Sequence, residues 1–377
     1  MNDPFGPEQI VKVYDTALGM QGFLVIDNTA LGVGKGGIRM TPGVTEEEVF
    51  RLARTMTWKN ALAGIPFGGA KAGIVWNPSE EIKNDKKKLS ETKKHFIQSF
   101  ARAITQFAPK KYIAGPDVNT GEAEMAWFVA ATGNRKSVTG KPKKLGGLPH
   151  ELGSTGFGVF EASKAASEIR GLNLKKATVA IEGFGNVGTF ACKYLHEAGA
   201  RIIGVSDRGG TAFFPAGLDY KTLMAAKAQS GTVTTYPGAH KLPYDSIFGL
   251  ETDILITAAV TDAINEKNKH SIRTKIIVEG SNIPMKETIE KDLWKKDILI
   301  VPDFVANAGG VISSYAEHIG LSSQKMFALV EEKIKKTTKK VLQMSEARNK
   351  NPRDVALALA KEKVERAMKK RKSVFDI

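Results

Sequence analysis

Hydrophobic positions recur at helical spacing between Thr45 and Gly64, and a glycine-rich segment follows at once. Thr45 with Glu48 fits a capping box, and Gly64 is a suitable C-cap. The buried face would consist of positions spaced i, i+3, i+4: Val49, Leu52, Ala53, Met56 and Ala63. The pattern therefore predicts a helix that carries Lys59 on its last turn. The glycines of the next segment, PFGG, predict a tight bend just before Lys71.

A second amphipathic pattern runs from Asp85 to Phe107 and ends before Pro109. Its apolar face is Leu89, Phe96, Ile97, Phe100, Ile104 and Phe107. Upstream of both patterns, the apolar stretch from Ile10 to Asp27 predicts strands that lead into a loop carrying Lys35.

The segment YIAGPDVNT predicts a strand that runs into a polar turn holding Asp117. A helix from Glu122 to Ala131 should follow. Residues 133–153 are rich in Gly, Pro and Lys without periodicity, which is typical of a connection between domains.

From Ala177 the pattern changes to strand, turn, helix, strand: ATVAIE, GFGNVG, TFACKYLHEAG and RIIGVSD. A G-x-G-x-x-G that follows an apolar strand and opens a helix favours a dinucleotide-binding fold. Gly183 would permit the tight turn, Gly185 would let the backbone approach the pyrophosphate, and Gly188 would let the helix pack on the strand. The helix N–H groups would face the phosphates.

Asp207 ends the next strand, about twenty residues beyond the last glycine of the motif. Its carboxylate could accept hydrogen bonds from the adenosine ribose, which favours NAD. Arg208 beside it could instead bind a 2′-phosphate, so NADP remains open.

Three further strands, at residues 253–257, 275–279 and 298–301, complete the pattern of a doubly wound sheet. Ala258 and Ala259 would lie at a strand's carboxyl end, beside the cofactor. We expect an α/β protein with two domains around a cleft: an N-terminal α/β substrate, catalytic and oligomerisation domain at 1–150, and a Rossmann-type domain at 151–321. The helices of 322–377 should return to the first domain.

Composition limits the alternatives. A chain of 377 residues, 42% hydrophobic and 25% charged, is typical of a globular protein with about two domains. The absence of a spanning apolar run and of a signal peptide predicts a cytoplasmic protein without a membrane partner. The single cysteine, Cys192, is expected to be a buried structural thiol. The six histidines have no ligand-like spacing, so no metal is assigned.

The formal net charge of +15 could indicate nucleic acid binding. Much of the excess lies in amphipathic stretches such as 333–340 and 361–372, where a solvated helix face accounts for it. No nucleic-acid-binding motif accompanies the charge, and nucleic acid is not expected as a partner. The charge could steer anionic substrates and dinucleotides towards the protein.

Lys35, Lys59 and Lys71 all lie in glycine-rich or apolar surroundings, which suits a pocket for an anion. The alternative for each lysine is a solvated surface charge. Asp117, taken alone, is as well explained as a turn or cap residue.

Seven segments, in this order, resemble the signatures of the glutamate, leucine, phenylalanine and valine dehydrogenase family. They are GVGKGGIRMTP (32–42), MTWKNALAGIPFGGAKAGI (56–74), GPDVNT (115–120), STGFGV (154–159), GFGNVG (183–188), EGSN (279–282) and PDFVANAGGVISSYAE (302–317). The resemblance implies reversible, NAD(P)-dependent oxidative deamination of an L-amino acid to a 2-oxo acid and ammonium.

The resemblance also implies the roles of the substrate residues. Lys71 and Asp117 would be catalytic, and Lys59 would bind the α-carboxylate. Lys35 and Ser314 would bind a distal carboxylate, which makes L-glutamate the expected substrate.

On the cofactor side, the resemblance places Thr155 at the nicotinamide carboxamide and Asn282 beside the nicotinamide ribose. The remaining cofactor positions are Gly183, Gly185, Asn186, Val187, Gly188, Asp207, Ala258 and Ala259. Two segments depart from the family pattern. HELG (150–153) stands where an arginine precedes the threonine motif, and Thr261 and Asp262 replace an asparagine.

The family further implies a homo-oligomer, a hexamer by resemblance. One alternative on the same fold is a leucine, phenylalanine or valine dehydrogenase, although those relatives generally carry an apolar residue at the position of Lys35. The other is a catalytically silent regulatory or nucleic-acid-binding relative, against which the retained lysines, Asp117 and the glycine motif argue.

Overall fold

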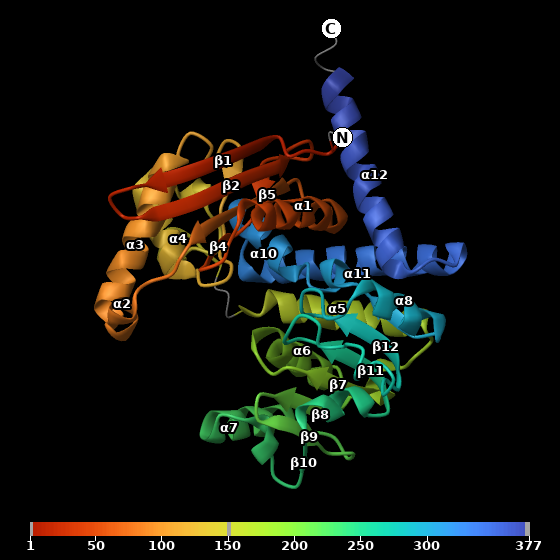
Figure 1. Ribbon diagram of the computed structural model, residues 1–377. Helices are drawn as coiled ribbons and strands as arrows, with labels where there is room; N and C mark the ends of the chain where they lie inside the picture. Colours follow the sequence, from red (N-terminus) through yellow and green to blue (C-terminus); the bar gives the residue numbers. More distant parts are fainter. Residues whose placement is uncertain (1–2, 149–151, 374–377) are drawn as a thin grey trace. The chain divides into compact units, whose positions relative to one another are not determined.

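The computed structural model describes residues 3–148 and 152–373, which form two compact units (Figure 1). The first contains the described residues up to Leu152, Val311–Met326 and those from Leu359 onwards. The second contains Gly153–Gly310 and Phe327–Ala358. The C-terminal segment therefore differs from the expectation that 322–377 would return as a whole to the first domain, because residues 327–358 belong to the second unit.

The first unit is built on a mixed sheet of order β1-β2-β5-β3-β6, with β4 paired to β5. The strands are β1 (Gln9–Asp15), β2 (Met20–Asn28), β3 (Gly34–Lys35), β4 (Ile38–Thr41), β5 (Gly68–Val75) and β6 (Tyr112–Ile113). Its helices are α1 (Glu46–Ala63), α2 (Glu80–Asn84), α3 (Lys86–Ala103) and α4 (Glu122–Thr132), with short 3-10 turns at Arg135–Ser137 and Lys143–Leu145.

Alternating residues of β2 explain the two covered faces of this sheet. Leu24 and Ile26 pack in the same core as Ile97 of α3 and Phe128 of α4. Phe23 and Val25 pack with Val49 and Ala53 of α1. Because both faces are buried, the strand has a nearly continuous apolar sequence.

The helix predicted from Thr45 is confirmed as α1. Thr45 accepts a hydrogen bond from the N–H of Glu48, and Gly64 ends the helix in the left-handed conformation. The predicted face was partly wrong, because Leu52 and Met56 are only partly buried whereas Thr57 and Asn60 are fully buried.

The tight bend expected at Gly68 and Gly69 is wrong, because both residues open strand β5. A Cβ atom on Gly68 would lie 2.1 Å from the carbonyl oxygen of Asn28, and one on Gly69 would lie 2.0 Å from Oγ1 of Thr57. The glycines are therefore required for close packing between β5 and its neighbours. Lys35 is also on a strand, β3, rather than in the expected loop.

The second unit contains the predicted doubly wound sheet, of order β10-β9-β8-β7-β11-β12-β13. Its five parallel strands are β7 (Thr178–Glu182), β8 (Arg201–Asp207), β11 (Thr252–Thr257), β12 (Thr274–Glu279) and β13 (Leu299–Val301). Two antiparallel strands at one side of the sheet, β9 (Gly210–Phe213) and the outermost strand β10 (His240–Leu242), were not predicted.

The helices of this unit are α5 (Ser154–Ile169), α6 (Asn186–Glu197), α7 (Tyr220–Ser230), α8 (Glu287–Lys295) and α9 (Asp303–Ala306). Three more, α10 (Gly309–His318), α11 (Ser323–Arg348) and α12 (Pro352–Ser373), contribute residues to both units. Short 3-10 segments occur at Leu174–Lys176, Val233–Thr235 and Tyr244–Gly249. Cys192 lies fully buried on α6, and burial raises the pKa of its thiol.

Two further observations concern the described residues as a whole. None of their helices is both long and apolar enough to cross a membrane. Nor does any group of three His, Cys, Asp or Glu among them form a candidate metal site.

Candidate active site

The centre of the first unit is an ion pair between Lys71 and Asp117. Nζ of Lys71, on β5, lies 2.9 Å from Oδ1 of Asp117, in the turn after β6. This turn is fixed because the Asp117 N–H donates to Oγ1 of Thr120, and the same hydroxyl donates to the carbonyl oxygen of Ile38 on β4. The sequence thus brings two residues 46 positions apart into direct contact.

Arg39 completes the pair and was not predicted from the sequence. Its Nε atom donates to Oδ2 of Asp117 at 2.8 Å, and its NH1 atom donates to Oε1 of Glu48 at 2.7 Å. Arg39 lies within the GGIR segment, on β4, opposite Gly73 of the neighbouring strand β5.

The surroundings shift both pKa values. Burial lowers the pKa of Lys71, with a further contribution from the charge of Arg39, and together they outweigh the opposing effect of Asp117. Burial acts to raise the pKa of Asp117, but the charges and hydrogen bonds of Lys71 and Arg39 outweigh it, so the pKa is lowered. The site therefore combines a readily deprotonated amine with a readily ionised carboxylate.

Lys35 is a second buried cation, 4% exposed, on β3. Its Nζ atom donates to the carbonyl oxygen of Ala114 at 3.0 Å. A Cβ on Gly115 would lie 2.5 Å from this ammonium, so the glycine provides the space it occupies. Burial lowers the pKa of Lys35 to about 7, with smaller contributions from the charges of Lys71 and Lys141.

Helix α10 brings the segment around Ser314 to this unit. Tyr315 and His318 make edge contacts with the ring of Phe67, at centroid distances of 5.6 and 5.4 Å. Glu317, one helical turn after Ser314 and hence on the same face, partly offsets the lowering of the pKa of Lys35. Ser314 is partly exposed on that face.

Glu317 is a buried anchor that the sequence did not reveal. It accepts hydrogen bonds from Nζ of Lys141 at 2.6 Å and from the N–H groups of Gly140 and Leu148, both at 3.0 Å. These bonds tie α10 to segment 140–148 of the same unit. Lys59 lies on α1, but it precedes the last turn of the helix rather than occupying it as predicted, and it is partly exposed.

The glycine motif of the second unit has the expected geometry. Gly183 has a φ angle of 96°, and a Cβ on Gly188 would lie 1.9 Å from the carbonyl oxygen of Gly183. A Cβ on Gly185 would meet nothing within 4 Å, and Gly185 and Asn186 are exposed at the start of α6, with Val187 next in that helix. This bare helix N-terminus fits a dinucleotide pyrophosphate.

A buried carboxylate that sequence reasoning missed organises the neighbouring loop. Glu182, at the end of β7, accepts from the N–H groups of Ala258 and Ala259 at 3.0 and 3.2 Å and from the hydroxyl of Tyr244. Ala258 and Ala259 thus lie, as expected, at the carboxyl end of β11 and beside Gly183.

The nicotinamide-side candidates also lie at the carboxyl edge of this sheet. Asn282 is exposed after β12, and its Oδ1 atom accepts from Nδ2 of Asn307 at 3.0 Å. Thr155, in the first turn of α5, lies close to Gly310, since a Cβ there would be 3.0 Å from its Oγ1 atom. His150 and Glu151, which depart from the family pattern, are outside the described residues.

Asp207, expected from the sequence to accept hydrogen bonds from the adenosine ribose, is already bound by other groups of the protein. Its carboxylate accepts from Nζ of Lys227 at 2.6 Å, Oγ1 of Thr232 at 2.8 Å, and the N–H groups of Gly209 and Val233 at 2.8 and 2.9 Å. Four donors occupy the roughly four lone-pair positions of a carboxylate. The ribose interaction expected from the sequence would have to replace one of these bonds.

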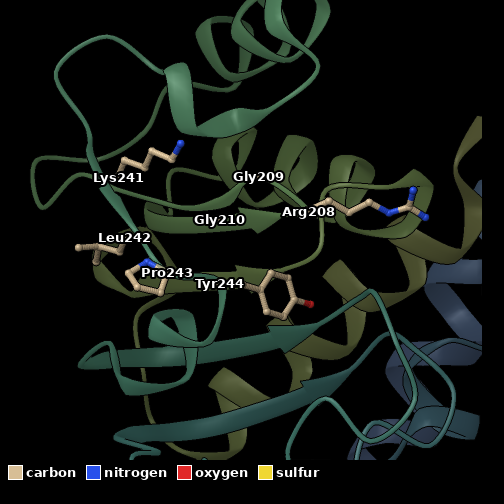
Figure 2. A pocket seen from close by; sticks show the side chains of 7 residues that line it. All are labelled: Arg208, Gly209, Gly210, Lys241, Leu242, Pro243 and Tyr244. Carbon is tan, nitrogen blue, oxygen red and sulfur yellow. The ribbon is translucent and has the colours of Figure 1, made fainter.

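Beside this carboxylate lies a pocket of about 360 Å³, lined by residues 208–210 and 241–244. Figure 2 shows Arg208 and Lys241 at opposite ends of it, with Tyr244 between them. Arg208 is exposed.

Family models match both parts of the chain. The dimerisation domain of the Glu/Leu/Phe/Val dehydrogenases matches residues 7–134, and Glutamate/Leucine/Phenylalanine/Valine dehydrogenase matches residues 146–372. The chain belongs to this family.

Relatives within the Glu/Leu/Phe/Val dehydrogenase family agree with this placement. A glutamate dehydrogenase of Aeropyrum pernix is 39% identical, over 91% of the chain and 85% of the relative. An NADP-specific glutamate dehydrogenase of Saccharolobus shibatae is 35% identical, over 97% and 90%. An NAD-specific glutamate dehydrogenase of Staphylococcus aureus is 38% identical, over 79% and 72%.

Solved structures of the family have the same fold. The hetero-hexameric glutamate dehydrogenase of Thermus thermophilus in its Leu-bound form superposes with a TM-score of 0.83 at 28% identity, covering 97% of this chain and 90% of the other. The L-tryptophan dehydrogenase of Nostoc punctiforme gives 0.75 at 28% identity, covering 96% and 97%.

Proposed function

We propose that the protein catalyses the reversible oxidative deamination of L-glutamate to 2-oxoglutarate and ammonium. The observation that carries this proposal is the ion pair between the buried Lys71 and the partly exposed Asp117, joined at 2.9 Å, with a further buried cation, Lys35, in the same unit. An amine of lowered pKa beside a carboxylate can act in general acid–base catalysis on an amino acid and its imine.

Three residues of the first unit each have a role in the proposed reaction. Lys59 binds the α-carboxylate. Lys71, in its neutral form, activates the water that adds to the imine and stabilises the carbonyl oxygen of the product. Asp117 carries protons to and from the substrate nitrogen. A bound oxidised dinucleotide would supply the acceptor for the hydride that leaves the α-carbon.

Selection of a dicarboxylate is assigned to Lys35 and Ser314. A γ-carboxylate beside Lys35 would complete a charge-assisted pair, whereas leucine would leave a buried ammonium without an anionic partner. The names of the relatives support the same choice, because three of them are glutamate dehydrogenases.

We propose that both NAD and NADP serve as cofactor, with NAD used at least as well. Thr155, the glycine motif, the two alanines after β11 and Asn282 would hold the dinucleotide. Because Lys227 already pairs with Asp207, that carboxylate repels a 2′-phosphate less than a free one would. Arg208 is available to meet such a phosphate.

We also propose a homo-oligomer, most simply a homohexamer, located in the cytoplasm. Supporting the assembly, residues 7–134 match a dimerisation domain, and edge strand β1 exposes Ile10 and Tyr14 by 44% and 63%. Light scattering of the purified protein measures the subunit number.

The reaction is tested by following oxidation of NADH and NADPH with ammonium and 2-oxoglutarate, in parallel with 4-methyl-2-oxopentanoate, phenylpyruvate and indole-3-pyruvate. We expect the highest kcat/KM with 2-oxoglutarate. A preference for one of the apolar 2-oxo acids would replace glutamate by the matching amino acid, and no turnover with any of them would exclude the proposed reaction.

A further inference from the structure

Ile283 has a backbone conformation that its side chain disfavours. Its φ angle is 49°, in the left-handed region, where a β-branched residue is a genuine outlier. The other non-glycine residues with positive φ among the described ones are all Asn or Asp, which tolerate this region: Asn119, Asp262, Asp297 and Asn349. Ile283 is nevertheless 56% exposed, so packing of its own side chain does not explain the conformation.

Both backbone groups of Ile283 are held by other residues. Its N–H donates to Oδ2 of Asp303 at 3.0 Å, and its carbonyl oxygen accepts from the N–H of Asp262 at 3.0 Å. The preceding carbonyl, that of Asn282, accepts from Oγ1 of Thr261 at 3.2 Å. A strained conformation persists only where its surroundings fix it in this way, and such residues concentrate at functional sites.

Arg353, at the start of α12, fixes the position of Asp303, the residue that binds the N–H group of Ile283. NH1 of Arg353 donates to Oδ1 of Asp303 at 2.9 Å, NH2 donates to Oε2 of Glu279 at 2.5 Å, and Nε donates to Oε2 of Glu290 at 2.5 Å. Glu279 ends β12, immediately before the loop that contains Ile283, and Glu290 lies in α8 after it. One guanidinium therefore braces the loop on both sides.

The loop has the position and the groups of a cofactor contact. It leaves the carboxyl end of a parallel strand, where dinucleotides bind in open α/β sheets. The side-chain oxygen of Asn282 is engaged by Asn307, which leaves its amide nitrogen to donate to a ligand. Ile283 places an exposed apolar group next to it.

We propose that Arg353, through Asp303, is a positioning residue that holds Ile283 in its left-handed conformation, so that Ile283 and Asn282 together contact the nicotinamide half of the dinucleotide. The proposal rests on the dinucleotide binding assigned under the proposed function, but not on the choice of amino acid.

The variant Ile283→Gly separates a positioning role from a structural one. Glycine relieves the strain, so thermal stability should stay the same or rise. Binding of NADH, followed by its fluorescence, should weaken by about tenfold or more, whereas ADP-ribose, which lacks nicotinamide, should bind within about twofold of wild type. The matched control is Asn349→Gly, which relieves a left-handed residue between α11 and α12 and should change neither affinity.

The variant Arg353→Lys tests the three ion pairs of the guanidinium. Lysine keeps the positive charge but lacks the planar set of donors that binds three carboxylates at once. It should reproduce the selective loss of NADH affinity. Combined with Ile283→Gly it should add little, since both changes release the same loop. Unchanged NADH affinity in Ile283→Gly, an equal loss of ADP-ribose affinity, or fully additive effects would each overturn the proposal.

These binding measurements need no turnover. A wild-type protein that binds NADH but reduces no 2-oxo acid would contradict the proposed function, whereas the positioning of Ile283 by Arg353 could still be tested by NADH binding. An active enzyme whose Ile283→Gly variant binds NADH as tightly as wild type would contradict the brace alone.

Discussion

The ammonium of Lys71 lies 2.9 Å from Oδ1 of Asp117, and both residues belong to one unit, with Lys71 buried and Asp117 partly exposed. Arg39 binds the other oxygen of the same carboxylate. Asp117 therefore remains ionised while burial favours the neutral form of Lys71. The pair can exchange a proton with substrate without either group first having to approach the other.

Lys71→Ala should remove nearly all turnover, because no other amine contacts Asp117 in the described part of the chain. Binding of NADH should be unchanged, since the glycine motif belongs to the other unit. Steady-state kinetics and NADH fluorescence measure the two effects. A kcat above about a tenth of wild type, equivalent to less than ~1.4 kcal/mol in the barrier, would remove Lys71 from the mechanism.

Asp117→Asn should also reduce kcat by more than about tenfold, because an amide keeps the shape but cannot take up the proton. It also withdraws the negative charge that opposes deprotonation of Lys71, so the pKa of Lys71 should fall further. The acidic limb of the residual pH profile should accordingly move to lower pH. A variant with wild-type kcat would mean that Asp117 only shapes the turn.

Lys35→Leu should raise KM for glutamate steeply and favour apolar amino acids in relative terms. In the wild type, bound leucine leaves the buried Lys35 ammonium without a carboxylate, which costs roughly 2–5 kcal/mol and corresponds to about thirtyfold or more in selectivity for glutamate. The measurement is kcat/KM for glutamate and for leucine in both proteins. Unchanged glutamate kinetics would exclude Lys35 from γ-carboxylate binding.

The pKa of Lys35 of about 7 predicts a pH-dependent preference for dicarboxylates. Only the ammonium form, which predominates below this pKa, pairs with a γ-carboxylate. The ratio of kcat/KM for 2-oxoglutarate to that for 2-oxopentanoate should therefore fall as pH rises above about 7, by up to about tenfold per unit. The ratio cancels groups that act on both substrates. Lys35→Leu should give a flat ratio, and a flat ratio in wild type would contradict the assignment.

Lys227→Met should shift cofactor preference towards NAD. The change leaves the Asp207 carboxylate without its cationic partner, so it should repel a 2′-phosphate and lower kcat/KM for NADPH by about tenfold or more relative to NADH. Lys221→Met, an exposed lysine on the same helix α7, is the matched control. An unchanged ratio would mean that Asp207 does not face the ribose.

Three parts of the fold could be predicted because signals close together in the sequence determine them. Apolar runs indicated the parallel strands, capping residues indicated helix α1, and the spacing of the glycines indicated the turn after β7. The bend expected at Gly68 and Gly69 was wrong because glycine also serves close packing, and only the helix and strand opposite reveal which role applies. Arg39, Glu182 and Glu317 could not be found because Asp117, Ala258 and Gly140, which they respectively contact, lie 78, 76 and 177 positions away along the chain.

The division of the C-terminal helices was missed for a related reason. Residues 322–372 are rich in Lys and Glu throughout, so their composition does not show which part belongs to which unit. In the structure, Arg353 pairs with three carboxylates of the second unit. Which unit a helix joins depends on such contacts.

Cys192 has a practical consequence for following motion in the protein. It is the chain's single thiol and lies on α6 with no exposed surface. A thiol reagent can react there only after α6 has separated from its neighbours, so the labelling rate reports the opening frequency of the second unit, free of signal from the first. Nucleotide that rests on the start of α6 should slow this labelling in proportion to its occupancy.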